Sequence, residues 1–427
     1  MFSNQKPVRQ SAAFLLLALL AICAASAAAQ TNKLPVGNAN FVSSTKIGAM
    51  TVAEVNQGIE KAFGTSVSPT ASPLDLYKIN YRSTDEKNNP VVLSGLVVLP
   101  RGGAPNGLVI FNHGTIVNSE SAPSRFTGTA SKSGTEVPTL AFASGGYAVA
   151  MPDYLGLGDD TGAHPYPLGA INSLSAVDII EPARYLAAQQ NTPVGARLFV
   201  TGYSEGGAVA MWTVRNLEKK SGAIYNVSAA APASGPYDLS GTTRNWLLAA
   251  PTDDQAFIVR LYLTAYMAYY FHKSSGAKLT DYFKPAMALT VSLNFKGNIS
   301  DEDLLVRLAV AAALMRPQKS LVNVLKPSFV QALQTLDTSD PTIQAMQKND
   351  CYDWAPRTKM LLINLQGDTV VDQGNTEKAF QTMRQRGVGA NVLRRYEIKD
   401  TSLNHLTAMA PAMAQARRFF DGKFAGD

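Results

Sequence analysis

The sequence predicts an α/β fold in which helices flank a mostly parallel central sheet. One observation is the alternation of short apolar runs, typical of buried strands, with segments of helical periodicity. Another is a change of rhythm at residues 240–355, where strand-like runs stop and segments rich in Ala, Leu, Met and Tyr take over. An all-helical block between two strands of one sheet indicates an inserted cap. The core should therefore consist of two stretches, residues 30–239 and 356–427.

The expected strands are apolar runs that end in glycine, proline or polar residues. In chain order they are residues 75–81, 91–99, 107–111, 147–151, 196–201, 227–231, 359–365 and 391–398. The expected helices show helical spacing of apolar residues or an N-terminal capping sequence. They are residues 51–63, 174–189, 207–216, 256–271, 300–315, 375–386 and a last helix that ends near residue 420.

The composition favours a folded protein with a large core and argues against nucleic-acid binding. The chain has 427 residues, of which 46% are hydrophobic and 16% are charged, so it can bury a sizeable core. Its formal net charge is +6, but no run of Lys and Arg is long enough to indicate a nucleic-acid partner. A mildly basic, solvated surface is the better interpretation.

Residues 1–29 have the three parts of a secretory signal peptide. Lys6 and Arg9 form a positive start, residues 12–24 form an apolar centre, and three alanines at 27–29 give a cleavage site. The alternative, an uncleaved membrane anchor, needs an apolar run of about 20 residues. We therefore expect cleavage and a secreted or periplasmic protein.

Cysteine and histidine usage indicates neither disulfides nor metal. Cys23 would leave with the signal peptide, so Cys351 would be the single remaining cysteine and no intramolecular disulfide could form. Lipid attachment at Cys23 is an alternative, although Ile22 is a poor residue before a lipidated cysteine. The four histidines and two cysteines fall in no metal-ligand spacing. We expect no metal and no cofactor, and a structural role for Cys351.

A strand, tight turn and helix are expected around Ser204. The sequence Gly-Tyr-Ser-Glu-Gly at residues 202–206 follows an apolar run and precedes a helix-compatible segment. This order is that of the G-x-S-x-G nucleophile elbow. Gly202 and Gly206 suit the cramped turn because they carry no Cβ. Ser204 is therefore the candidate nucleophile.

A serine nucleophile needs a base and an orienting acid. Reacting groups in such sheets lie at the carboxyl ends of strands, where the sequence places His113, Asp153, Ser204, Asp368 and His405. His405 follows the last expected strand, so the order Ser, Asp, His is that of an α/β hydrolase. Asp368 directly follows a strand and is the preferred acid. Asp372 and Asp238 remain alternatives.

The oxyanion of a tetrahedral intermediate needs two backbone N–H donors. The residue after the nucleophile, Glu205, should provide one. The loop after the strand at residues 107–111 should provide the other, and Thr115 is the preferred residue there. The side chain of Glu205 has no assigned role.

These motifs together resemble the secretory lipases, the α/β-hydrolase family of the fungal lipase A type and its bacterial relatives. The resemblance covers about residues 70–422 and is carried by residues 112–115, 152–158, 164–166, 202–207 and the Trp-x-Pro at 354–356. It implies an α/β-hydrolase fold with Ser204, Asp368 and His405 as the triad. It also implies that the insertion at 240–355 is a lid over an acyl-binding pocket. One departure is Asp372, where relatives often have proline.

The residues predict an exported serine carboxylic-ester hydrolase that works through an acyl-enzyme on Ser204. The apolar, tyrosine-rich cap favours uncharged lipid-like or aromatic esters. The expected partner is thus a small-molecule or lipid ester, with transient contact of the cap with a lipid interface and no obligate protein partner. A serine peptidase with the same triad is the main alternative, and a non-enzymatic binding protein is the other.

Overall fold

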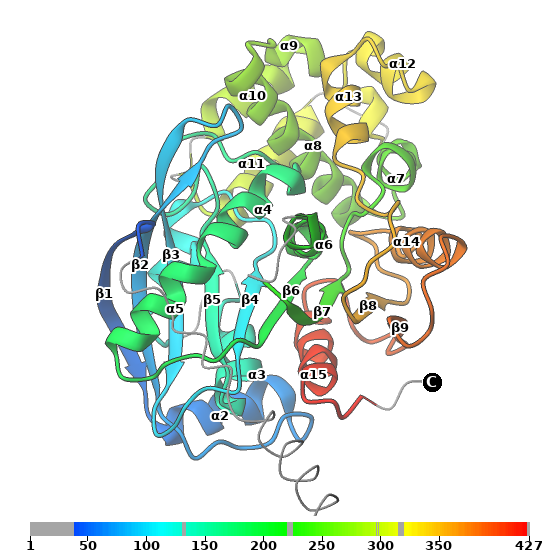
Figure 1. Ribbon diagram of the computed structural model, residues 1–427. Coiled ribbons are helices and arrows are strands. Elements are labelled where there is room, and N and C mark those ends of the chain that lie inside the picture. The colour runs from blue at the N-terminus through cyan, green and yellow to red at the C-terminus, as the bar shows by residue number, and fades with distance from the viewer. Residues whose placement is uncertain are drawn as a thin grey trace, which may run out of the picture. The chain divides into compact units, whose positions relative to one another are not determined.

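The computed structural model describes residues 38–129, 134–219, 225–295, 297, 299–314 and 320–424. These residues are organised around a nine-stranded sheet with the order β1-β2-β3-β5-β4-β6-β7-β8-β9 (Figure 1). The neighbours from β5 to β9 pair in parallel, whereas β1, β2, β3 and β5 pair antiparallel. The prediction of a mostly parallel sheet is confirmed. The predicted signal peptide at residues 1–29 lies outside the described residues.

Every expected strand is present, with small shifts at the ends. The strands are β1 (Phe41–Met50), β2 (Leu74–Thr84), β3 (Pro90–Pro100), β4 (Leu108–Asn112), β5 (Ala148–Pro152), β6 (Leu198–Tyr203), β7 (Val227–Ala233), β8 (Met360–Leu365) and β9 (Leu393–Ile398). The sequence does not predict β1. This strand lies at the edge of the sheet with mostly exposed Ser, Thr and Lys side chains, so it lacks the apolar pattern of a buried strand.

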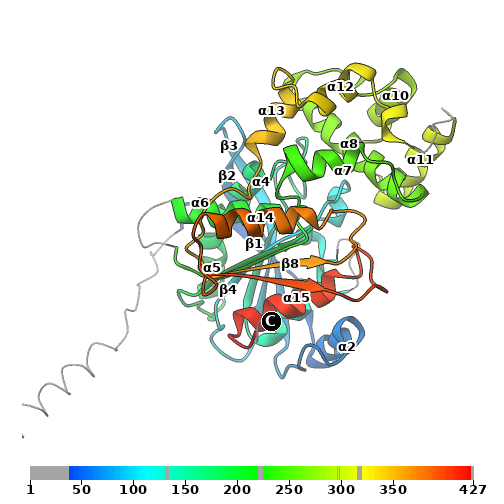
Figure 2. The same cartoon turned by 90° about the vertical axis from the view of Figure 1, so that its right-hand side faces the viewer.

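Helices cover both faces of the sheet, and the strands alternate between the two resulting cores. Leu198 and Val200 of β6 pack into one core, and Phe199 and Tyr203 pack into the other. The first core is closed by α4 (Gly169–Asp178), α5 (Ile180–Gln189), α6 (Glu205–Lys219) and α14 (Gly374–Gln385). The second is closed by α2 (Val52–Phe63), α3 (Glu136–Phe142) and α15 (Met409–Phe420). Figure 2 shows α14 and α15 on opposite sides of the strands.

One helix prediction is wrong in detail. The expected single helix over residues 174–189 is two helices, α4 and α5, which meet at Ile179. Pro182 lies in the first turn of α5 and has no N–H to bond the turn before it. The apolar side chains on both sides of this break stay in the same core, which is why the periodicity alone does not reveal it.

The segment between β7 and β8 is helical and forms the cap. It contains α7 (Arg244–Leu248), α8 (Asp254–Ser275), α9 (Leu279–Tyr282), α10 (Pro285–Asn294), α11 (Asp301–Leu314), α12 (Pro327–Thr335) and α13 (Pro341–Lys348). The cap has its own apolar core, to which α8 contributes Tyr262 and Tyr266. Hydrogen bonds join it to the loop after β4, with Tyr266 Oη donating to Ile116 O at 2.9 Å. None of the described helices combines the length and apolarity that crossing a bilayer requires.

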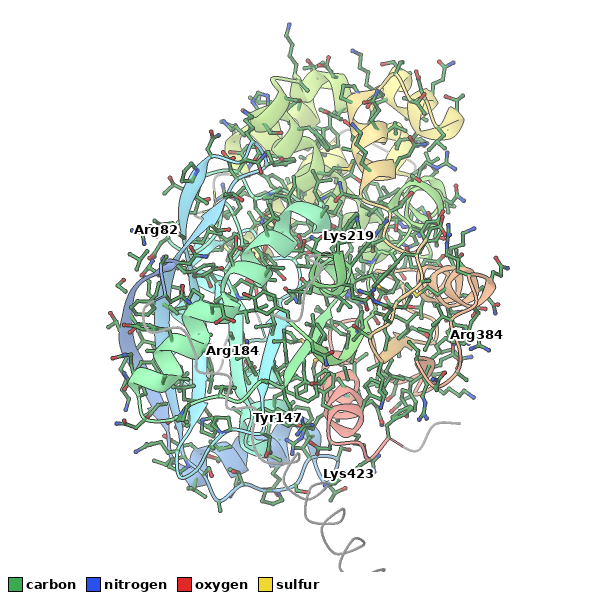
Figure 3. The ribbon with its side chains drawn as sticks, viewed as in Figure 1. Arg82, Tyr147, Arg184, Lys219, Arg384 and Lys423 are labelled. Atoms are coloured by element: carbon green, nitrogen blue, oxygen red, sulfur yellow. The ribbon has the colours of Figure 1, made fainter. Side chains whose placement is uncertain are left out.

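Basic side chains are spread over the surface of the part of the protein that contains the sheet. Arg82, Lys219, Arg384 and Lys423 come from separate elements and are exposed (Figure 3). This distribution agrees with the mildly basic, solvated surface that the composition indicates.

Candidate active site

Ser204 lies at the apex of the tight turn formed by residues 202–206. β6 ends at Tyr203, and α6 begins at Glu205. Ser204 has φ +60°, a left-handed conformation that is strained for a side-chain-bearing residue. A Cβ on Gly206 would clash with the Asn112 carbonyl oxygen, and a Cβ on Gly202 would clash with the Gly206 carbonyl. Only glycine therefore fits on either side of the strained serine.

Ser204, His405 and Asp368 form one chain of hydrogen bonds. His405 Nε2 lies 2.8 Å from Ser204 Oγ, and His405 Nδ1 lies 2.7 Å from Asp368 Oδ2. A carboxylate only accepts, so Nδ1 carries the proton and Nε2 is left to accept the Ser204 hydroxyl proton. Both partners are buried, with 4% of His405 and 9% of Asp368 exposed. The arrangement places a base within reach of the Ser204 hydroxyl proton.

The other carboxylate candidates are engaged elsewhere. Asp368 Oδ1 accepts the N–H groups of Val370 and Val371, which fixes Oδ2 toward His405. Asp372 Oδ1 instead accepts the Gly374 N–H at 2.7 Å. Asp238 caps a π-helical turn by accepting two backbone N–H groups. Of the acids weighed from the sequence, the structure places Asp368 against the imidazole.

Tyr203 holds His405 in position, a role that the sequence does not reveal. Its hydroxyl donates to the His405 carbonyl oxygen at 2.6 Å, and the two rings lie 5.1 Å apart. Burial raises the pKa of Tyr203, so it remains a neutral donor. The residue before Ser204 thus connects the loop that carries His405 to the elbow. No local signal could have shown this, because 202 residues separate the two partners.

The loop after β4 lies against the elbow, as the oxyanion prediction requires. Gly114 and Thr115 line the same cavity as Ser204, and a Cβ on Gly114 would lie 3.4 Å from Ser204 Cβ. His113 braces this loop, since its Nδ1–H donates to Gly114 O at 2.7 Å. Burial lowers the pKa of His113, which favours the neutral ring. The assignment of the Thr115 and Glu205 N–H groups to the oxyanion stays a prediction.

Asp153 lies at a strand end but outside the hydrogen-bond chain of Ser204. Its Oδ2 accepts from Ser94 Oγ at 2.6 Å, and its Oδ1 accepts the Ser124 N–H at 2.9 Å. Burial raises its pKa. A Cβ on Gly158 would clash with this carboxyl group. The loop of residues 153–158, Asp-Tyr-Leu-Gly-Leu-Gly, therefore packs against the carboxyl group of its own first residue. This carboxyl group has a structural role and does not contact Ser204 or His405.

The side chain of Glu205, which has no role from the sequence, is part of a buried cluster. Glu205 Oε1 accepts from Asn172 Nδ2 at 3.1 Å and lies 2.9 Å from His164 Nε2. His164 Nδ1 lies 3.0 Å from Leu155 O. The only sequence signal was the presence of His164 in one of the motifs that carry the family resemblance.

A cavity of about 650 Å³ lies above Ser204 and is shared by the core and the cap. The cap helix α8 lines it with Val259, Leu263 and Met267, which are spaced four residues apart on one face. Such a volume and lining suit a small, largely apolar molecule. Within the described part of the chain, no three His, Cys, Asp or Glu side chains are grouped as metal ligands. Cys351 is buried away from this cavity, and burial raises the pKa of its thiol.

Comparison with solved structures identifies the fold. A Legionella pneumophila protein classed provisionally as a hydrolase matches with a TM-score of 0.77 and 24% identity over 90% of this chain and 98% of that one. The rice cell wall degrading esterase LipA of Xanthomonas oryzae matches with a TM-score of 0.72 and 22% identity, covering 90% and 99%. The chain has the α/β-hydrolase fold.

Candida antarctica lipase A also matches this chain, with a TM-score of 0.63 and 14% identity over 92% of this chain and 84% of that one. The resemblance to the lipase A type is thus confirmed at the level of the fold. No protein-family model matches the sequence, and no curated protein sequence matches it.

Proposed function

We propose that the protein is an exported serine carboxylic-ester hydrolase that cleaves uncharged lipid-like or aromatic esters. The observation that carries this proposal is the buried chain from Asp368 through His405 to Ser204 at the wall of a largely apolar cavity. The esterase and lipase among the proteins of the same fold support ester chemistry.

The proposed reaction has two halves. Ser204 Oγ attacks the ester carbonyl carbon while His405 Nε2 takes the hydroxyl proton, and the N–H groups of Glu205 and Thr115 stabilise the oxyanion. His405 then returns the proton to the departing alcohol, which leaves an acyl group on Ser204. Water attacks this acyl-enzyme with His405 again as the base, the bond between the acyl carbon and Ser204 Oγ breaks, and His405 returns the proton to Oγ as the carboxylic acid leaves. Asp368 keeps the imidazole in the required tautomer throughout.

An acyl-chain series of p-nitrophenyl esters, with Ser204→Ala as the blank, tests the proposal. We expect turnover by the wild-type protein that falls by at least about three orders of magnitude in the variant, because the nucleophile is lost. Activity that survives Ser204→Ala unchanged would refute the mechanism.

An aminoacyl or short-peptide hydrolase is the second candidate. The observation that favours it is that Asp301 and Glu302 line the cavity, where they could face a substrate amine. Asp301 is already bound, since it accepts from Tyr262 Oη at 2.8 Å and from the Val117 N–H at 3.1 Å. Burial also raises the pKa of Asp301, which weakens it as an anion. Faster cleavage of an aminoacyl p-nitroanilide than of p-nitrophenyl butyrate would favour this candidate.

Export and contact with a lipid interface belong to the same proposal. The signal-like residues 1–29 support export, and recovery of the mature chain outside the cytoplasm with residue 30 at its start would test it. Large apolar side chains are exposed on α10 and α11, namely Leu289, Leu293, Val306, Val310 and Leu314. They support interface contact, which predicts that Val306→Ser with Val310→Ser lowers activity on an emulsified ester more than on a dissolved one.

A further inference from the structure

A buried pair of ionisable side chains lies directly behind the elbow. Glu205 is the residue after Ser204, and its Oε1 lies 2.9 Å from His164 Nε2. Only 2% of the Glu205 side chain and 1% of the His164 side chain are exposed. Neither group reaches the proposed hydrogen-bond chain of Ser204, so the reaction scheme above leaves the pair without a role.

The partners of His164 fix how many protons the pair holds. Its Nδ1 lies 3.0 Å from the Leu155 carbonyl oxygen, which can only accept, so Nδ1 carries a proton. Its Nε2 faces a carboxyl oxygen. Either Nε2 is also protonated and Glu205 is ionised, or Glu205 is protonated and donates to Nε2. In both arrangements one additional proton is present and the pair as a whole is neutral.

No other described side chain can neutralise Glu205. Among the described residues no Lys or Arg forms an ion pair with it. The titratable side chains that face it, from the loops after β4 and β5 and from α8, are His113, Tyr154, Tyr166 and Tyr266. Burial lowers the pKa of His113 and raises the pKa of each tyrosine, which favours the uncharged form of all four. The two ring nitrogens of His113 face the carbonyl oxygens of Gly114 and Asp153, and not Glu205.

The position of Glu205 makes its charge important for catalysis. Under the proposed function its backbone N–H binds the developing oxyanion, while its own carboxylate lies in the same buried region. A carboxylate with no compensating positive charge would repel the negative charge that develops on the oxyanion in the transition state. The low polarity of the buried region would strengthen this repulsion. His164 and Asn172 both contact Glu205 Oε1, whereas Oε2 has no hydrogen-bond partner among the described residues.

We propose that His164 is a positioning residue that shares one proton with Glu205 and so keeps the region behind the oxyanion site electrically neutral. The inference rests on the proposed ester hydrolysis. It predicts that loss of the His164 proton lowers kcat by placing a negative charge behind the oxyanion. It also predicts that removal of the Glu205 charge restores the rate.

The test compares His164→Gln with the double variant His164→Gln, Glu205→Gln on p-nitrophenyl butyrate. We expect His164→Gln to lower kcat about tenfold at pH 8, with KM within about twofold, since a charge near the oxyanion acts on the transition state of a neutral substrate. The double variant should recover most of kcat, because it removes the carboxylate charge together with its partner.

His272→Gln is the matched control. His272 also bonds a backbone carbonyl through Nδ1, at 2.8 Å from Ala277 O, but it lies on the cap helix and does not line the cavity. Its kcat should stay close to that of wild type, and the addition of Glu205→Gln should not raise it. A His164→Gln deficit that persists in the double variant would show a purely structural role and overturn the inference.

Two further outcomes are informative. If His164→Gln does not fold, the inference still requires the double variant to fold and turn over, because it removes the buried charge together with its partner. A folded double variant with less than about a tenth of the wild-type kcat would overturn the inference. Failure of ester hydrolysis itself would appear differently, as no difference between the wild-type protein and Ser204→Ala.

Discussion

The choice of Asp368 as the orienting acid gives the sharpest prediction. In Asp368→Asn the amide oxygen can keep the N–H groups of Val370 and Val371, which now bind Oδ1 at 2.9 and 3.0 Å. The amide NH2 then takes the place of Oδ2, 2.7 Å from His405 Nδ1. Because NH2 can only donate, Nδ1 must become an acceptor, and the imidazole proton moves to Nε2.

His405 can then no longer act as the base for Ser204, although the three side chains keep their positions. His405 Nε2, now 2.8 Å from Ser204 Oγ, would donate a hydrogen bond instead of accepting a proton. In serine proteases, the corresponding change of the triad aspartate to asparagine also gives the wrong imidazole tautomer, and it lowers kcat by about 10⁴. We expect a loss of 10³ to 10⁴ here, or about 4–5 kcal/mol in activation free energy.

The assay is kcat for p-nitrophenyl butyrate at pH 8, with Asp372→Asn as the matched control. Asp372 also lines the cavity and loses the same charge, but its carboxylate binds the Gly374 N–H and not His405. We expect the control to retain kcat within about threefold. A larger loss in Asp372→Asn than in Asp368→Asn would refute the assignment of the acid.

Three further predictions concern stability and specificity. Gly206→Ala should destabilise the fold by about 3 kcal/mol or more in thermal or urea unfolding, because its Cβ clashes with backbone at Asn112; a native-like midpoint would contradict the elbow geometry. Asp350, whose carboxylate accepts from Ser240, has its pKa raised to about 6 by burial. Since the unfolded pKa is about 3.9, the native state holds a proton that the unfolded state has released between about pH 4 and 6, and stability falls as pH rises through this window. The free energy of unfolding of Asp350→Asn should therefore rise by about 2 kcal/mol relative to that of wild type between pH 4 and 7, whereas a constant difference would exclude this linkage. Leu263→Trp should shorten the preferred acyl chain, because it fills cavity volume from α8, and an unchanged chain-length profile would place the acyl group elsewhere.

The sequence predicts what is local or strongly patterned. The elbow follows from a strand, a turn and two required glycines, and the buried strands follow from their apolar runs. His405 and Asp368 were selected because each follows a strand, and parallel strands bring their carboxyl ends to one edge of a sheet. The edge strand β1 is not predicted because most of its side chains are exposed or polar, so its few packed apolar residues form no alternating pattern.

The remaining features of the site depend on contacts between distant residues. Tyr203 and His405 meet only once the sheet has formed, and the Glu205–His164 pair joins the start of α6 to the loop after β5 across 41 residues. The sequence could not show that Asp301 of the cap binds the loop after β4, since helix periodicity gives the faces of a helix and not its neighbour. The cavity is shaped by such contacts, and substrate length is therefore a question for experiment.

The most direct test of the central claim is covalent labelling of Ser204 by a fluorophosphonate, read by peptide mass spectrometry. A nucleophile activated by His405 predicts one adduct on the peptide that contains Ser204. Labelling should be absent in Ser204→Ala and strongly slowed in Asp368→Asn. No adduct on the folded wild-type protein, or an adduct on another residue, would contradict the account.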